Sequence, residues 1–129
     1  MTLVLDASAI VAACTIDDGF APYGDEPLCG PPLLWSEARS VLHVGLWRGQ
    51  LDQDNAVIAL DLLENGPVQQ TSHPRLGKEA WRIADDLGWA KTYDAEYLAL
   101  ASLLRCGLAT LDRRLHTAAA RLGIETTAI

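Results

Sequence analysis

Two carboxylates end short apolar runs that predict strands. Asp6 follows the run 2–5, and Asp112 follows the run 108–111. Both runs consist mainly of apolar or β-branched residues, as in strands covered on both faces of a sheet. Each acid also stands directly before a predicted helix. Open α/β sheets place their chemistry at such strand-to-helix turns, so the two acids are candidates for one site.

Two further carboxylates lie where core patterning predicts apolar side chains. Glu37 is three residues after Leu34, on the apolar stripe of its predicted helix, and Asp94 is one turn before Leu98. An acid that faces a core needs a partner, because an unpaired buried charge is strongly unfavourable. Bases do not stand in matching positions, although Lys91 lies where it can reach Asp94.

A shared cation is the alternative partner for these four acids. Two carboxylates about 4 Å apart repel by about 4 kcal/mol at an effective dielectric of 20. Four of them together would need one or two divalent metals, or some protons. All-oxygen ligation favours Mg²⁺ or Mn²⁺, and such sites assist the attack of water on a phosphodiester. In isolation, Asp112 is explained as well by helix capping, and Asp94 by the dipole of its helix.

The elements that must position the acids alternate between short strands and helices. This order predicts a doubly wound parallel sheet with helices on both faces, and Asp6 ends its central strand. Segment 15–32 is rich in Asp, Gly and Pro, and we expect it to be irregular or to hold a short helical piece. The predicted strands cover residues 2–5, 68–71, 108–111 and 124–127. The predicted helices cover residues 7–13, 33–47, 52–66, 72–88 (capped by Ser72), 92–105 (capped by Thr92) and 113–122.

Composition predicts one soluble globular domain over residues 1–129. Half of the 129 residues are hydrophobic and 21% are charged, which is ordinary for such domains. No apolar run reaches the roughly 18 residues of a membrane span, and no basic segment precedes the first apolar run. We therefore expect a cytoplasmic protein without a signal peptide. The three cysteines are odd in number and lack metal-ligand spacing, so we expect buried or half-buried apolar thiols.

The net charge of −7 argues at first against a nucleic-acid ligand, since phosphate binding usually depends on Lys and Arg. The argument weakens if several acids converge on one metal site, because a divalent cation reverses the local field.

Four segments together resemble the PIN domain, and within that family the VapC-type toxins of bacterial toxin–antitoxin pairs. They are residues 4–8, 35–38, 92–101 and 108–112, and their order and spacing match the family from end to end. The run Tyr-Asp-Ala-x-Tyr-x-Ala-Leu-Ala within 93–101 is the most specific of them. The resemblance implies a PIN-like doubly wound α/β fold and a Mg²⁺- or Mn²⁺-dependent endoribonuclease.

The same resemblance implies the site residues and the partners. Asp6 and Asp94 match the most direct metal ligands, with Glu37 and Asp112 completing the site or acting through water. Ser8 and Thr110 match the supporting hydroxyl positions beside these acids. The family further implies a homodimer, an RNA substrate and a VapB-like antitoxin whose tail blocks the active-site groove.

Several neighbouring side chains have two interpretations each. Arg113 and Arg114 either hold RNA phosphates or begin a solvated helix. The aromatic side chains near the site either stack on bases or pack in the core or a dimer contact; they are Trp35, Trp89 and Tyr93. Glu96 is expected to face away from Asp94 and to be structural.

Three other functions compete with the nuclease. A haloacid-dehalogenase-type phosphatase would use Asp6 as its nucleophile, but it needs an Asp where this chain has Ser8. A receiver-like phospho-acceptor domain would want an acidic pair after the first strand and a lysine in the last loop, and neither is evident. A catalytically silent PIN scaffold would not need all four acids.

Overall fold

All five strands of the sheet run parallel. The computed structural model describes residues 1–127, so the last two residues of the predicted domain lie outside the described residues. The strand order is β3-β2-β1-β4-β5, which places the first strand at the centre, as predicted. The strands are β1 (Leu3–Leu5), β2 (Leu28–Gly30), β3 (Val68–Gln70), β4 (Gly107–Ala109) and β5 (Thr126–Thr127).

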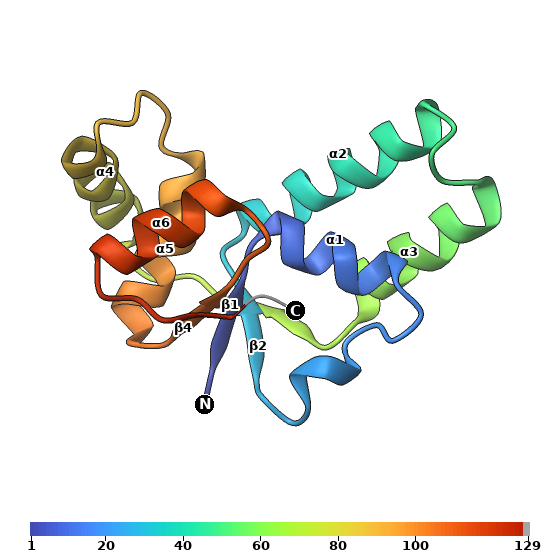
Figure 1. The fold of residues 1–129 in the computed structure, drawn as a ribbon, viewed down its shortest axis with the longest axis horizontal. Coiled ribbons are helices and arrows are strands. Elements are labelled where there is room, and N and C mark those ends of the chain that lie inside the picture. The colour runs from blue at the N-terminus through green and yellow to red at the C-terminus, as the bar shows by residue number, and fades with distance from the viewer. Residues whose placement is uncertain (128–129) are drawn as a thin grey trace.

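Helices cover both faces of this sheet, which confirms the predicted doubly wound architecture (Figure 1). Helices α1, α2 and α3 lie on one side, and α4, α5 and α6 lie on the other. The chain winds outward from β1 to β3, returns to β4 beside β1, and then continues to β5. The order of the strands therefore reverses between β1 and β4, where such folds bind ligands. The helices are α1 (Ala7–Thr15), α2 (Leu33–Trp47), α3 (Gln53–Asn65), α4 (Leu76–Leu87), α5 (Tyr93–Leu104), α6 (Arg113–Arg121) and a short 3₁₀ helix (Ala21–Tyr23).

Aspartates begin three of the helices. Asp6 caps α1 by accepting from the Ala9 amide, Asp52 caps α3 and Asp112 caps α6. A side chain that accepts from the first-turn amides satisfies donors that the helix cannot. Within residues 1–127, none of the helices combines the length and apolar character that crossing a bilayer would require.

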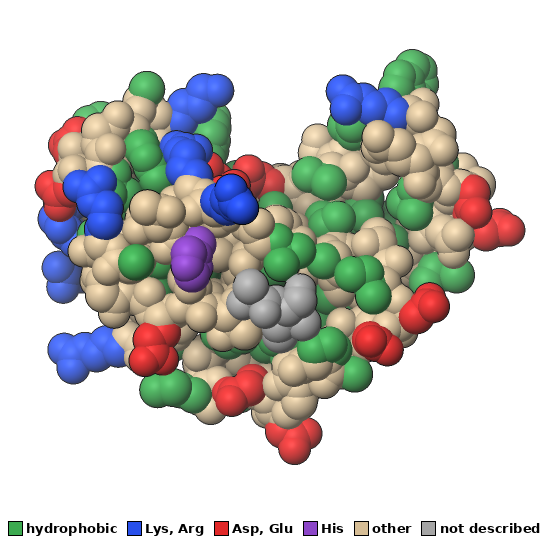
Figure 2. All heavy atoms as spheres, viewed as in Figure 1, with side chains coloured by type: hydrophobic (Ala, Val, Ile, Leu, Met, Phe, Trp, Pro, Cys, Tyr) green, Lys and Arg blue, Asp and Glu red, His purple; other side chains and the backbone are tan. Residues whose placement is uncertain are grey.

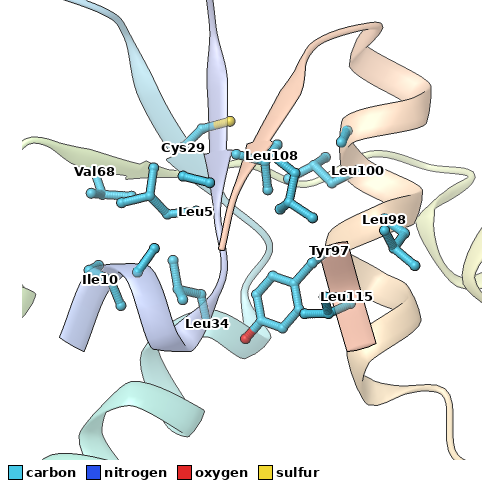
Figure 3. Packing of buried hydrophobic residues seen from close by; sticks show 14 of the residues in the cluster. Leu5, Ile10, Cys29, Leu34, Val68, Tyr97, Leu98, Leu100, Leu108 and Leu115 are labelled. Carbon is cyan, nitrogen blue, oxygen red and sulfur yellow. The ribbon is translucent and has the colours of Figure 1, made fainter. Parts of the chain in front are cut away.

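The core lies on both faces of β1 and β4 (Figure 3). Leu5 and Leu108 from these strands are fully buried, and α5 contributes an almost continuous buried face from Ala95 to Ala101. That helix is apolar around most of its circumference, as its sequence predicts. Cys14 and Cys29 are buried, Cys106 is half-buried, and all three are free thiols, which confirms their expected state.

Three sequence predictions about these elements are wrong. Segment 15–32 contains the predicted helical piece, but it also contains β2, which the sequence did not predict because prolines flank it. Ser72 does not cap α4, because the helix begins only at Leu76 and the preceding turn is held by Arg75 N–H donating to His73 Nδ1 (3.0 Å). Thr92 stands at the cap position of α5 but makes no capping hydrogen bond.

Candidate active site

The ends of β1 and β4 bring the first and last of the four acids together. Leu5 pairs with Ala109, and the Asp6 amide donates to the Ala109 carbonyl (3.2 Å). The next residues along the two strands, Asp6 and Thr110, therefore lie side by side at the carboxyl edge of the sheet. This is the point where the strand order reverses.

Hydrogen bonds hold both carboxylate oxygens of Asp6. Ser8 Oγ and the Ala9 amide donate to Oδ1 at 2.7 and 2.9 Å, and Thr110 Oγ1 donates to Oδ2 at 2.5 Å. The residue is only 2% exposed. Burial raises the pKa of this carboxyl and the charge of Asp112 raises it further, while the bonds from Thr110, Ser8 and Ala9 oppose the rise.

The two hydroxyls also fix the loop that follows β4. The Leu111 amide donates to Ser8 Oγ at 2.9 Å, and the Asp112 amide donates to Thr110 Oγ1 at 3.0 Å. Each hydroxyl therefore accepts from a loop amide and donates its proton to Asp6. Asp112 then accepts from the Arg114 amide at 2.8 Å, so its carboxylate caps α6 as well as facing the site.

Tyr97 links Glu37 to the other acids. Its hydroxyl donates to Glu37 Oε1 at 2.5 Å, across sixty positions of sequence, and its ring is 1% exposed. Figure 3 shows the ring among the buried leucines, with its hydroxyl pointing toward α2. Burial raises the pKa of Tyr97, and so do the charges of Glu37, Asp6 and Asp94. The tyrosine is thus within electrostatic reach of three of the four acids.

Asp94 has a basic partner, contrary to the sequence prediction. Arg114 Nη1 donates to Asp94 Oδ2 at 3.0 Å, and its guanidinium lies 4.1 Å from the centroid of the Trp89 ring. The cation comes from α6 and not from the nearby Lys91. The pair is partly exposed, so a competing ligand can exchange for either partner.

One residue near the site escaped sequence reasoning. Tyr97 had a detectable signal, since it stands three residues after Asp94 and so on the same face of α5. The structural role expected of Glu96 stays a prediction; burial raises its pKa, and the nearby charge of Glu37 raises it further. Trp35 has a packing role, because its Nε1 donates to the Leu63 carbonyl at 3.1 Å.

The donor set of the site suits a hard divalent cation. All of its candidate ligands are oxygen atoms, as Mg²⁺ and Mn²⁺ prefer, and Thr110 already joins the Asp6 carboxylate to the backbone amide of Asp112. In the described part of the chain, no three carboxylate, imidazole or thiol side chains lie close enough to hold an ion together. Glu37 and Asp94 are instead bonded to Tyr97 and Arg114. That all four acids share one cation therefore stays a prediction.

A hollow opens beside the site. Ala7 lines it from the start of α1, Glu37 and Val41 are among the side chains that line it from α2, and it continues to Arg48. Figure 2 shows the surface hollowed between α2 and the half of the molecule formed by α4, α5 and α6. Val41 is 50% exposed on this surface. An extended ligand in this hollow can therefore reach Glu37 from solvent.

Comparison with known proteins finds similar chains over most of this sequence. The PIN domain family model matches residues 3–121. Ribonuclease VapC9 of Mycobacterium tuberculosis is 37% identical over 117 residues, which are 88% of this chain and 87% of the relative. PAE2754 from Pyrobaculum aerophilum has a solved structure with a TM-score of 0.73 and 25% identity, covering 92% of this chain and 84% of its own. Mycobacterium tuberculosis VapC20, a sarcin-ricin loop cleaving toxin, shares the fold with a TM-score of 0.61 and 16% identity, covering 90% and 94%.

Proposed function

This chain belongs to the PIN domain family, and we propose that it is a VapC-like endoribonuclease that hydrolyses RNA phosphodiesters. One observation carries the proposal. The carboxylate of Asp6 and the backbone amide of Asp112 are held together through the Thr110 hydroxyl at the reversal of strand order, in a chain 37% identical to a named ribonuclease.

Mg²⁺ or Mn²⁺ is the proposed cofactor. Asp6 and Asp94 would be its most direct ligands, with Glu37 and Asp112 completing the site or acting through water. When bound, such an ion lowers the pKa of a bound water and stabilises the leaving oxygen of a phosphodiester. The all-oxygen donor set supports this choice.

The protein's own contribution is to orient the carboxylates. Ser8 and Thr110 fix both oxygens of Asp6, which is the central acid of the proposed site. Tyr97 fixes one oxygen of Glu37, and Arg114 compensates the charge of Asp94. Preorganised groups of this kind lose little free energy to reorientation when the substrate binds.

The competing phosphatase is disfavoured by the state of Asp6. A nucleophilic carboxylate must reach the phosphorus atom, but Asp6 is 2% exposed and both of its oxygens accept hydrogen bonds. The absence of an Asp at position 8 points the same way. Nothing about the site favours a receiver-like module or a silent scaffold.

The proposed substrate, partners and location follow from the family relationship. We infer an RNA substrate, a VapB-like antitoxin that inhibits the nuclease, a homodimer and a cytoplasmic location. Co-expression with the product of a small neighbouring reading frame, followed by size-exclusion chromatography, tests the antitoxin and the dimer together.

The nuclease itself is tested with Asp6→Asn and Asp94→Asn. Each purified variant is assayed against total RNA with Mg²⁺, and its fold is checked by circular dichroism. We expect folded proteins without Mg²⁺-dependent cleavage. Undiminished cleavage by either variant would contradict the proposal. Asp61→Asn, an exposed change on α3, is the matched control and should retain full activity.

A further inference from the structure

A second hollow lies at Arg114, the partner of Asp94, and is lined by several arginines. Arg113, Arg114 and Arg121 line it from α6, together with Thr117, and Trp89 lines it from the segment between α4 and α5. Three of the ten Lys and Arg residues of an acidic chain therefore meet at one place. Figure 2 shows most of the Lys and Arg side chains over this half of the molecule.

The spacing along α6 explains why these side chains converge. Positions 114, 117, 118 and 121 follow the three- and four-residue steps that align side chains on one face of a helix. The step from Arg113 to Arg121 spans about 12 Å at about 1.5 Å per residue. At about 3.4 Å per nucleotide of stacked strand, this length accommodates about three or four nucleotides.

Two of the three arginines are available to a ligand. Among the described residues, neither Arg113 nor Arg121 forms an ion pair, and both are exposed. Arg114 is held in place by Trp89 beneath it and by Asp94 beside it. An arginine stacked on an indole presents the outer face of its guanidinium to a planar ligand, and a guanidinium is suited to bind phosphate.

The hollow also adjoins the acids directly. Arg114 bonds to Asp94 through its side chain, and its amide donates to the carboxylate of Asp112. A strand whose phosphate lies at the acids therefore meets the hollow within one or two nucleotides. A positive surface at this distance offsets the repulsion that an acidic protein otherwise exerts on RNA.

We propose that the surface formed by Trp89, Arg113, Arg114, Thr117 and Arg121 binds the single-stranded RNA that flanks the scissile phosphate. The arginines contact its phosphates, and the Arg114–Trp89 stack supports a base. This inference rests on the proposed nuclease function and extends it to the contacts that hold the substrate. An acidic protein segment is the rival occupant, and the test must separate the two.

The test measures binding without cleavage. The probe is a fluorescent, 2′-O-methylated single-stranded RNA, titrated with the full-length protein in EDTA and followed by anisotropy at several salt concentrations. The double variant Arg113→Gln/Arg121→Gln should raise Kd at least tenfold at low salt. The slope of log K against log salt should become shallower by about 1.4, which is about 0.7 for each lost phosphate contact.

The control variant is Lys78→Gln/Arg105→Gln. It has the same net charge of −9, which is −7 less two positive charges, but its changes lie on α4 and at the end of α5. We expect its Kd to stay within twofold of the wild-type value. Equal weakening by both double variants would mean that only net charge matters and would overturn the proposal.

Two further measurements complete the design. Trp89→Phe should abolish the quenching of tryptophan fluorescence by the RNA, and retention of that quenching would contradict the stack. A poly-glutamate peptide that binds tightly to this surface while the RNA does not would assign it to a protein partner and overturn the proposal. Binding of the RNA by a wild-type protein that cleaves no natural RNA would support the surface while contradicting the nuclease.

Discussion

The candidate site has two halves that are built differently. In the strand half, Asp6 follows β1 and Asp112 lies in the loop after β4, and the hydroxyls of Ser8 and Thr110 bond the Asp6 carboxylate to the backbone amides of that loop. In the helix half, Glu37 and Asp94 project from helices on opposite faces of the sheet. Each of these acids bonds one side chain, Tyr97 or Arg114, respectively.

The difference indicates which part of the site is already organised. In the strand half, every hydroxyl proton and every oxygen of Asp6 has a fixed partner, so little can change without breaking the loop after β4. In the helix half, each acid holds a partner that a ligand can replace. We infer that the strand half supplies rigidity and that the helix half adapts when substrate binds.

Thr110→Val should have the largest effect, because it removes a link of the rigid half while conserving shape. Asp6 loses a donor and the Asp112 amide loses its acceptor. We expect cleavage to fall about 100-fold, and the free energy of unfolding to fall by about 1–3 kcal/mol. Single-turnover cleavage and urea unfolding measure these quantities. Thr15→Val removes an exposed hydroxyl at the end of α1 and should change neither; a loss of similar size there would refute the distinction.

Tyr97→Phe should have a smaller effect, because it releases one acid of the adaptable half and keeps the buried ring. We expect about a tenfold loss of cleavage and about 1 kcal/mol of stability. A double-mutant cycle with Glu37→Gln measures whether Tyr97 and Glu37 act together in cleavage. If Tyr97 acts through Glu37, the double variant is no less active than Glu37→Gln alone. Additive losses would place the role of Tyr97 elsewhere.

Arg114→Gln should strengthen the binding of Mn²⁺ severalfold, since the cation that pairs with Asp94 is removed. The gain is small because a partly exposed ion pair contributes only about 0–1 kcal/mol. Isothermal titration calorimetry of the wild type and the variant measures it. Arg121→Gln removes the same charge two turns further along α6 and should leave the affinity nearly unchanged. Weaker binding in Arg114→Gln would mean that the arginine helps to hold the site together.

Asp6→Asn should have the smallest effect on stability, which appears in how stability depends on pH. Because the folded-state pKa of Asp6 is raised, the folded protein binds this proton more tightly than the unfolded chain does. Ionisation above that pKa therefore reduces stability, whereas a neutral amide does not titrate. The Tm of Asp6→Asn in EDTA, relative to that of the wild type, should therefore rise as the pH increases through that pKa, although the amide loses an acceptor for Thr110. A relative Tm that falls over this pH range would contradict this sign.

The two halves also differ in how many of their contacts the sequence predicts. The strand half has local signals, namely an apolar run, a terminal acid and a helix behind it, and the parallel-sheet rule then brings Asp6 and Thr110 together across 104 positions. No comparable rule pairs Tyr97 with Glu37 or Arg114 with Asp94. These contacts depend on how helices of different layers are oriented, which periodicity alone does not determine.

The same reasoning explains the missed strand. Leu28, Cys29 and Gly30 carry weak strand signals and stand between prolines that normally interrupt a sheet. Both prolines fall just outside the three paired residues, and β1 and β3 supply partners on either side. Burial between two strands therefore decided the structure where local propensity was uninformative.

The loop after β4 has one further consequence. Leu111 and Asp112 are exposed residues, yet their amide protons are donated to hydroxyls that are themselves bonded to a buried carboxylate. Amides in such surroundings exchange slowly with deuterium, unlike those of an ordinary surface loop. Any event that draws Ser8 or Thr110 away from Asp6 should accelerate that exchange. The exchange rates of the Leu111 and Asp112 amides at the molecular surface would therefore report on the hydrogen bonds of Asp6, a side chain that solvent scarcely reaches.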